Sequence, residues 1–223
     1  MLELCLDTSA GASVAVVEDG AVLARAREDN PRRHAEELGV LLETVCRAAG
    51  IDGPIRRAPW DRVCVGTGPA PFTGLRAGLI TAQVFARTAG VELYGVPSLA
   101  IVARGALDLL PAGHEVLAVT DARRQEVYWA RYRAAGPNGL EELSAPAVGR
   151  PESLGAQLRQ GDAVLVGPGA HLVRAVLPAS VGPVDEADAA VASRLVAAGL
   201  ARGEDLPAQP LYLRRPDIHG AQA

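Results

Sequence analysis

Residues 66–90, GTGPAPFTGLRAGLITAQVFARTAG, constrain the fold more than any other stretch of the chain. An apolar run at residues 62–65 leads into a loop rich in glycine and proline, and Thr73 is placed to cap a helix with its hydroxyl. The sequence therefore predicts a strand, a tight loop and a helix in this order.

Small residues form a ridge along this predicted helix. Gly74, Gly78, Ala82 and Ala86 recur every four residues, which places them on one line of its surface. Most other positions are apolar, so the helix is expected to be buried on more than one side. The bare ridge can pack within the chain or admit a helix of another molecule, and the period alone does not decide between the two.

Composition excludes several classes of protein. Hydrophobic residues make up 49% of the chain and aromatic residues only 4%, so the core must be built from Ala, Val and Leu. All 22 basic residues are Arg, which excludes mechanisms that need a catalytic or phosphate-binding Lys. With a net charge of −4 and scattered Arg pairs, the chain shows no basic stripe of a stand-alone nucleic-acid binder.

Motifs for metal and nucleophile chemistry are missing from the sequence. Cys5, Cys46 and Cys64 are odd in number and lack CxxC spacing, so we expect core thiols in a reducing cytosol. There is no HxxxH, HExxH or GxSxG, and a metal site and serine hydrolysis are not predicted. No leader-like or long apolar run is seen, so we expect a cytoplasmic protein without membrane contact.

The order of predicted elements repeats. In the first half we expect strands at residues 2–6, 13–18, 21–27, 62–65 and 93–96, and helices at 34–49, 73–89 and 97–110. After Pro111 the second half gives strands at 115–120, 125–133, beyond 139 and at 163–166, and helices at 151–160, 171–177 and 187–202. The prediction is an α/β protein of two lobes, residues 1–110 and 111–223, with an irregular Pro-rich tail from Asp205.

Each predicted lobe has an Asp at the end of its first strand and a Gly-Pro loop after a later strand. Asp7 and Asp121 could orient a metal or water in a cleft between the lobes, while the amides of Thr8, Ser9 and Gly66 to Gly68 could face nucleotide phosphates. Alternatively, the two Asp cap turns and the glycines only permit tight backbone. Both interpretations remain open at this point.

Five segments together resemble a known family: LCLDTSAGASVAVVEDG, GTGPAPFTGLRAGLITAQVFA, YGVPSLAIVA, DARRQEVYWARY and PLYLR. In this order they are similar to the TsaB family, formerly YeaZ. The resemblance implies a duplicated ribonuclease-H-like fold, the actin-like ATPase or ASKHA fold, in which each of two lobes has a mixed sheet flanked by helices.

The resemblance also implies a function. TsaB proteins are regarded as non-catalytic partners of the catalytic subunit TsaD, which with the ATPase TsaE transfers threonylcarbamoyl onto a tRNA adenosine next to the anticodon. The chain would meet TsaE and tRNA only through the complex. It would need no cofactor of its own, with ATP or ADP in the cleft left open.

In the family, the helices that correspond to residues 34–49 and 73–89 pack against TsaD, or against a second TsaB when the partner is absent. The resemblance therefore implies an interface for TsaD or for a homodimer on these two helices. Its expected residues are Leu38, Leu42, Val45, Gly74, Leu75, Gly78, Ala82, Phe85 and Ala86.

Two positions test the comparison with catalytic relatives. The metal-binding HxxxH of TsaD aligns near Ser98 and Val102, and neither side chain can take its place as a metal ligand. The family's GPGSFTG loop reads GPAPFTG here, and Pro71 has no amide to offer a phosphate.

Two alternatives differ in class from a partner subunit. The chain could itself be an ATPase or phosphotransferase of the same fold, with Asp7 and Asp121 as the only candidates for the chemistry. It could also be a homodimeric actin-like domain with an unrelated partner.

Overall fold

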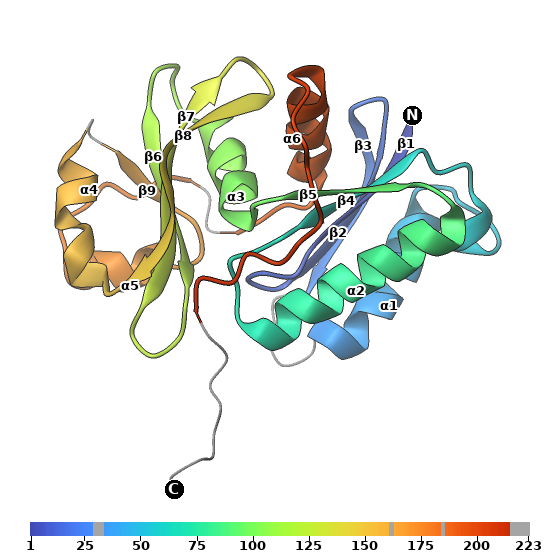
Figure 1. The fold of residues 1–223 in the computed structure, drawn as a ribbon, viewed down its shortest axis with the longest axis horizontal. Helices are drawn as coiled ribbons and strands as arrows, with labels where there is room; N and C mark the ends of the chain where they lie inside the picture. The colour runs from blue at the N-terminus through green and yellow to red at the C-terminus, as the bar shows by residue number, and fades with distance from the viewer. Residues whose placement is uncertain (29–33, 161–162, 184–185, 215–223) are drawn as a thin grey trace, which may run out of the picture.

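The computed structural model of the 223-residue chain describes residues 1–28, 34–160, 163–183 and 186–214. Two twisted sheets lie side by side, with α3 and α6 between them and the other helices on their outer sides (Figure 1). This is the predicted two-lobed α/β architecture. In the described residues, no helix combines the length and apolar character needed to cross a membrane.

The first sheet has the strand order β3-β2-β1-β4-β5. β2 is antiparallel to both of its neighbours, whereas β1, β4 and β5 are mutually parallel, as right-handed crossovers through helices require. The strands are β1 (Leu2–Asp7), β2 (Ala12–Glu18), β3 (Ala21–Glu28), β4 (Arg62–Gly66) and β5 (Glu92–Val96). All five predicted strands of the first half are confirmed.

The second sheet repeats this order with one strand fewer, as β8-β7-β6-β9. β6 is antiparallel to β7 and parallel to β9, and a single parallel bridge between Leu165 and Val181 marks the place of a fifth strand. The strands are β6 (Glu115–Asp121), β7 (Val127–Ala135), β8 (Gly139–Gly149) and β9 (Val164–Val166). The predicted duplication is therefore present in the topology.

The helices follow the predicted order but differ at their ends. They are α1 (His34–Ala48), η1 (Ile55–Arg57), α2 (Phe72–Ala89), α3 (Ser98–Leu107), η2 (Pro151–Leu154), α4 (Gly155–Arg159), α5 (Ala170–Arg174) and α6 (Ala190–Ala201). The prediction that Thr73 caps α2 is wrong, because α2 begins at Phe72 after Pro71 and no side chain caps it. At its other end Gly90 adopts the left-handed conformation, with φ of 74°.

The two halves exchange a helix. α3 comes from the first half but packs on β6 and β7, while α6 comes from the second half and packs on β1, β2, β4 and β5. The largest core cluster therefore joins the halves, with Cys5 and Cys64 beside Ile101 of α3 and Val196 of α6. A lobe boundary after residue 110 stays a prediction.

The C-terminal strap, residues 203–214, has no helix or strand but is tied to both halves. Leu206 accepts a hydrogen bond from Gly95 N at 2.9 Å, and Leu211 N donates to Thr67 O at 2.8 Å. Arg214 then donates to Ala122 O in the β6–β7 turn at 2.9 Å. The predicted irregular tail thus crosses from the first sheet to the second.

Candidate functional site

Asp7, at the end of β1, is buried and fully engaged within the chain. Its Oδ1 accepts hydrogen bonds from Ser9 N at 2.9 Å and from Ser9 Oγ at 2.5 Å, and its Oδ2 accepts from Ser98 Oγ at 2.5 Å. A Cβ on Gly66 would lie 1.8 Å from Oδ2, so only glycine fits beside this carboxylate. The structure therefore supports the turn-capping interpretation of Asp7 over the metal-orienting one.

The expected phosphate-facing amides are also engaged. Ser9 N donates to Asp7, Thr67 N donates to Val96 O, and Gly68 N donates to Ser98 Oγ at 3.0 Å. An amide that already donates inside the protein is not free for a phosphate oxygen. The prediction of a phosphate cradle from these three amides is wrong.

A cavity of about 270 Å³ lies between the two halves and contains three of the six expected nucleotide-facing residues. Thr8 and Ser9 line it from the β1–β2 turn, and Asp121 lines it from the end of β6. Asp121 is half-exposed, and its carboxylate accepts from Arg123 N at 2.7 Å and Nη1 at 3.2 Å. Asp7 does not line this cavity, so the two Asp of the predicted pair do not face a common ligand space.

The small-residue ridge of α2 faces its own sheet. A Cβ on Gly78 would lie 2.2 Å from Thr8 Oγ1, and Gly74 O accepts a hydrogen bond from that hydroxyl at 2.9 Å. Eight of the nine expected interface residues are buried within the chain: Leu38, Leu42, Val45, Leu75, Gly78, Ala82, Phe85 and Ala86. Their side chains are therefore not a surface that a partner could contact, which corrects the residue set but not the choice of helices.

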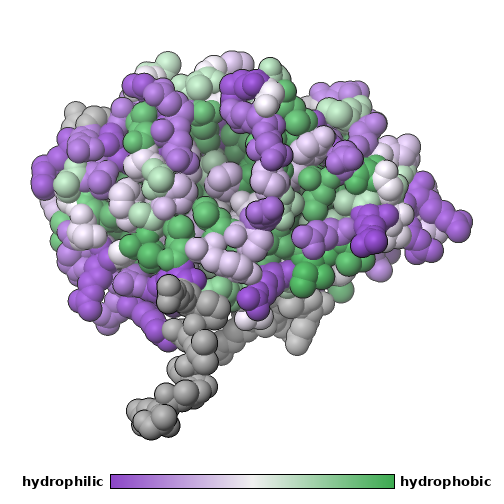
Figure 2. All heavy atoms as spheres, viewed as in Figure 1, coloured by the Kyte–Doolittle hydropathy of each residue, from purple (hydrophilic) through white to green (hydrophobic). Residues whose placement is uncertain are grey.

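The solvent side of α1 and α2 carries a different set of apolar residues, which we call the helical face: Val40, Ile80 and Val84. Their exposed fractions are 63%, 57% and 60%. Ile80 and Val84 line an open groove of about 390 Å³, and apolar surface shows among hydrophilic residues on this side of the molecule (Figure 2). Sequence reasoning missed them, although both lie on the same side of α2 as the exposed polar residues Arg76, Gln83 and Arg87.

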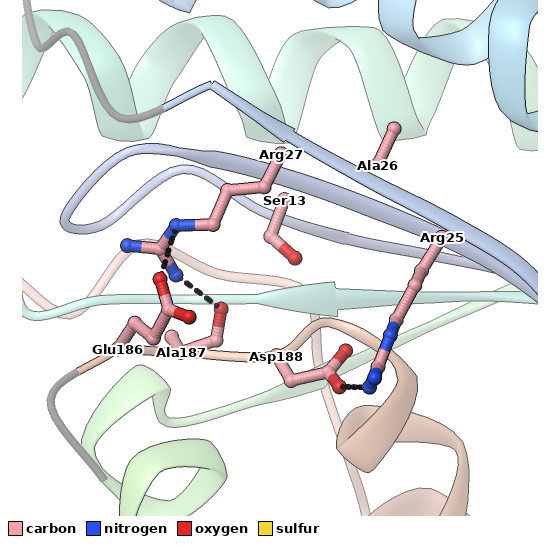
Figure 3. A pocket seen from close by; sticks show the side chains of 7 residues that line it. All are labelled: Ser13, Arg25, Ala26, Arg27, Glu186, Ala187 and Asp188. Atoms are coloured by element: carbon pink, nitrogen blue, oxygen red, sulfur yellow. Dashed lines mark hydrogen bonds and ion pairs between the residues drawn. The ribbon is translucent and has the colours of Figure 1, made fainter.

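A second cavity of about 270 Å³ lies where β3 meets the segment before α6 (Figure 3). Arg25 pairs with Asp188 at 2.6 Å, and Arg27 pairs with Glu186 at 2.7 Å. Ser13 Oγ accepts from Ala189 N at 3.0 Å below them. Each of the two guanidinium groups already contacts an acid, so these contacts fasten the second half to the edge of the first sheet.

Among the described residues, Glu3, Cys5 and Cys64 form one buried group with three potential metal-ligand atoms. Glu3 Oε1 accepts from Arg62 Nη2 at 2.6 Å, which neutralises its charge inside the core. A hydrogen bond with Cys64, followed by burial, raises the pKa of the Cys5 thiol well above its usual range. Burial also raises the pKa of Cys46 to about 11. These two thiols are neutral near pH 7 and are not activated nucleophiles.

Comparison with known proteins places this geometry in a family. A family model described as TsaD, tRNA N6-adenosine threonylcarbamoyltransferase, matches residues 27–162. The TsaB protein of Escherichia coli, named as a tRNA threonylcarbamoyladenosine biosynthesis protein, is 36% identical over 172 residues, covering 74% of this chain and 71% of its own. The chain belongs to the TsaB family.

Other relatives match more of its length. The uncharacterized protein Rv3421c of Mycobacterium tuberculosis is 37% identical over 220 residues, 96% of this chain and 92% of its own. The solved structure of YeaZ from Pseudomonas aeruginosa superposes with a TM-score of 0.78 at 30% identity, over 95% of this chain and 99% of that one. The expected duplicated ribonuclease-H-like, actin-like fold of a TsaB protein is thereby confirmed.

The positions aligned with the catalytic HxxxH are also explained by the fold. Ser98 and Val102 lie on α3 and are fully buried, Ser98 against Asp7 and Val102 in the core between the sheets. In this TsaB-family chain these positions serve packing and turn geometry.

Proposed function

We propose that this chain takes part in tRNA threonylcarbamoyladenosine biosynthesis as a non-catalytic subunit that docks a TsaD-like enzyme. Support comes from the TsaB proteins of Escherichia coli and Haemophilus influenzae, both named for this biosynthesis, and from the TsaD family match. In this proposal a TsaE-like ATPase and tRNA are reached through the complex. A homodimer forms only when the TsaD-like partner is absent.

The helical face is the observation that carries the proposal. Val40, Ile80 and Val84 expose aliphatic side chains from two neighbouring helices whose opposite sides are already packed in the core. Covering such a patch releases water from apolar surface, at about 25 cal/mol per Å² removed. Two helices of a partner that pack on α1 and α2 would bury it.

The state of the cleft supports a non-catalytic role. Asp7 is held by three hydrogen bonds within the chain, and the other acid, Asp121, accepts hydrogen bonds from Arg123. Both carboxylates are thus engaged by groups of the chain itself, whereas general acid or base work needs a carboxyl group free to reach a bound substrate.

The direct test is co-purification with the TsaD-like protein of the same organism. We expect Ile80→Arg to weaken the complex by about 100-fold or more, because a charge would be buried in an apolar contact. Val176→Arg is the matched control, since Val176 is 45% exposed in the second half. Equal binding of wild type and Ile80→Arg would contradict docking through the helical face.

Activity provides the second readout. Threonylcarbamoyl transfer should require the TsaD-like protein, rise when the wild-type chain is added, and fail to rise with Ile80→Arg. Transfer catalysed by this chain alone would refute the non-catalytic role.

A nucleotide in the cleft is the second candidate function, and the cavity at Thr8, Ser9 and Asp121 favours it. Calorimetry with ATP or ADP and Mg²⁺ tests this idea, with Asp121→Asn as the variant that should weaken binding. Hydrolysis that persists in Asp7→Asn and Asp121→Asn would count against both residues as catalysts.

A further inference from the structure

The helical face is framed by arginines although the chain as a whole is acidic, with 26 acidic against 22 basic residues. Arg76 lies one turn before Ile80 on α2, and Arg87 lies one turn after Val84 in the last turn of the same helix. All four positions are near neighbours on one side of the helix. The exposed stripe of α2 thus reads basic, apolar, apolar, basic along its length.

Two further arginines continue this frame toward α1. Arg56 of η1 lines the groove that holds Ile80 and Val84. Arg47, in the last turn of α1, lines an adjoining hollow of about 360 Å³ together with Arg56. Arg47, Arg56 and Arg87 make no ion pair with any described residue, and Arg76 contacts only aromatic groups, donating to Tyr212 Oη at 2.9 Å.

Two acids share the hollow with these arginines. Glu43 and Asp52 line the same hollow as Arg47 and Arg56, which leaves an excess of two positive charges among these six residues. Arg25, Arg27 and Arg131, by contrast, each pair with an acid of the chain. Guanidinium groups left unpaired beside an exposed apolar patch are suited to bidentate contacts with carboxylates.

We propose that the helical face binds a protein surface with an apolar centre and a rim of Asp and Glu that meets Arg47, Arg56, Arg76 and Arg87. The proposal rests on the docking role above and adds the chemistry of the partner. The aliphatic centre supplies most of the affinity, whereas the charged rim accelerates encounter and selects the partner.

The charges of these arginines favour one kind of binding partner over the others. A second copy of this chain would bring the same arginines, so like charges make a homodimer through this face weaker than a complex with an acidic partner. RNA would satisfy the arginines but would leave Val40, Ile80 and Val84 without apolar contact. An acidic protein surface matches both parts of the face.

The dependence of affinity on salt concentration distinguishes an acidic partner from a second copy of the chain. The affinity for the TsaD-like protein should fall between about 50 and about 500 mM NaCl, because salt screens the attraction between the arginines and the acids of the partner. The affinity of the homodimer should rise over the same range. Sedimentation and surface-binding kinetics measure both with the full-length proteins.

The charge-reversed variant Arg56→Glu with Arg87→Glu should lose about 10- to 100-fold in affinity at low salt, mainly through slower association. At high salt the loss should shrink. The matched control is Arg150→Glu with Arg174→Glu, which makes the same change in net charge in the second half.

The outcomes distinguish this inference from the proposed function. If Ile80→Arg breaks the complex but neither salt nor Arg56→Glu with Arg87→Glu affects it, the acidic rim is refuted and docking stands. If the wild type forms no complex, both are refuted. If the double variant loses tRNA binding and keeps the partner, the face binds RNA and the inference is overturned.

Discussion

The packing of β1 against its neighbours requires that two glycines carry no Cβ atom. Thr8 lies where Gly78 has only a hydrogen atom, and Asp7 lies where Gly66 has no side chain. The family-like TGLRAG segment is therefore explained by contacts inside the chain. Glycine recurs because β1 ends directly beneath the start of the helix.

Gly78→Ala should destabilise the fold by about 1–3 kcal/mol, because its Cβ would overlap the side chain of Thr8 and outweigh the better helix propensity of Ala. Urea unfolding measures the change. Gly39→Ala in α1 is the matched control, since its Cβ would meet nothing within 4 Å. The control should stabilise by roughly 0.5–1 kcal/mol, and a loss at Gly39 as large as that at Gly78 would refute the steric explanation.

At the scale of elements, strands and helices could be predicted from local pattern because apolar period, Asp-Gly turns and Gly-Pro loops act locally. The side of α2 that packs on the sheet could not be predicted in this way. Its ridge and its solvent stripe both contain small or apolar residues, and only the approach of Thr8 shows which side is buried. Likewise, Asp7 and Asp121 occupy equivalent strand ends, but Ser98, distant in sequence, engages one of them.

The exchanged helices α3 and α6 are joined by Asp108, which accepts hydrogen bonds from Arg104 Nη2 at 2.9 Å and Arg194 Nη2 at 3.1 Å. Burial alone would raise the pKa of Asp108, but the two guanidinium groups lower it below its usual 3.8. A lowered folded pKa means that the carboxylate stabilises the fold above pH 3.8. That contribution is lost as the pH falls below 3.8.

Acid unfolding should therefore depend on Asp108. The free energy of unfolding of the wild type should drop more steeply below pH 3.8 than that of Asp108→Asn, which cannot titrate. Urea titrations at successive pH values provide the slopes. Parallel curves for the two proteins would show that the contact carries no acid-sensitive stability.

At the scale of the whole molecule, three sets of contacts among the described residues hold the halves together. They are the exchanged helices, the ion pairs of Arg25 and Arg27, and the C-terminal strap. Tyr212 of the strap stacks on Phe72 with ring centroids 4.8 Å apart, while Arg214 pairs with Glu126. The strap thus joins the start of α2 to the β6–β7 turn, on either side of the cavity between the halves.

Tyr212→Ala with Arg214→Ala should release this connection without unfolding the sheets. Losing the ring contact and the charged hydrogen bonds should lower the local opening free energy by about 1–2 kcal/mol. Hydrogen exchange at Leu211 and Glu126 should then become roughly 5- to 30-fold faster. Arg133→Ala, which removes ion pairs with Glu141 and Glu115 at the end of the β6–β7 hairpin remote from its turn, should leave both amides unchanged.

The exchange of α3 and α6 bears on how the chain acquires its structure during synthesis. The first sheet is complete in sequence by Val96, yet one of its faces stays bare until α6, which begins at Ala190, has left the ribosome. Cys5, Ala15 and Cys64 belong to the core cluster that α6 completes. The first half must therefore remain partly open through most of translation. The final third of the chain therefore sets the time at which the first third becomes native.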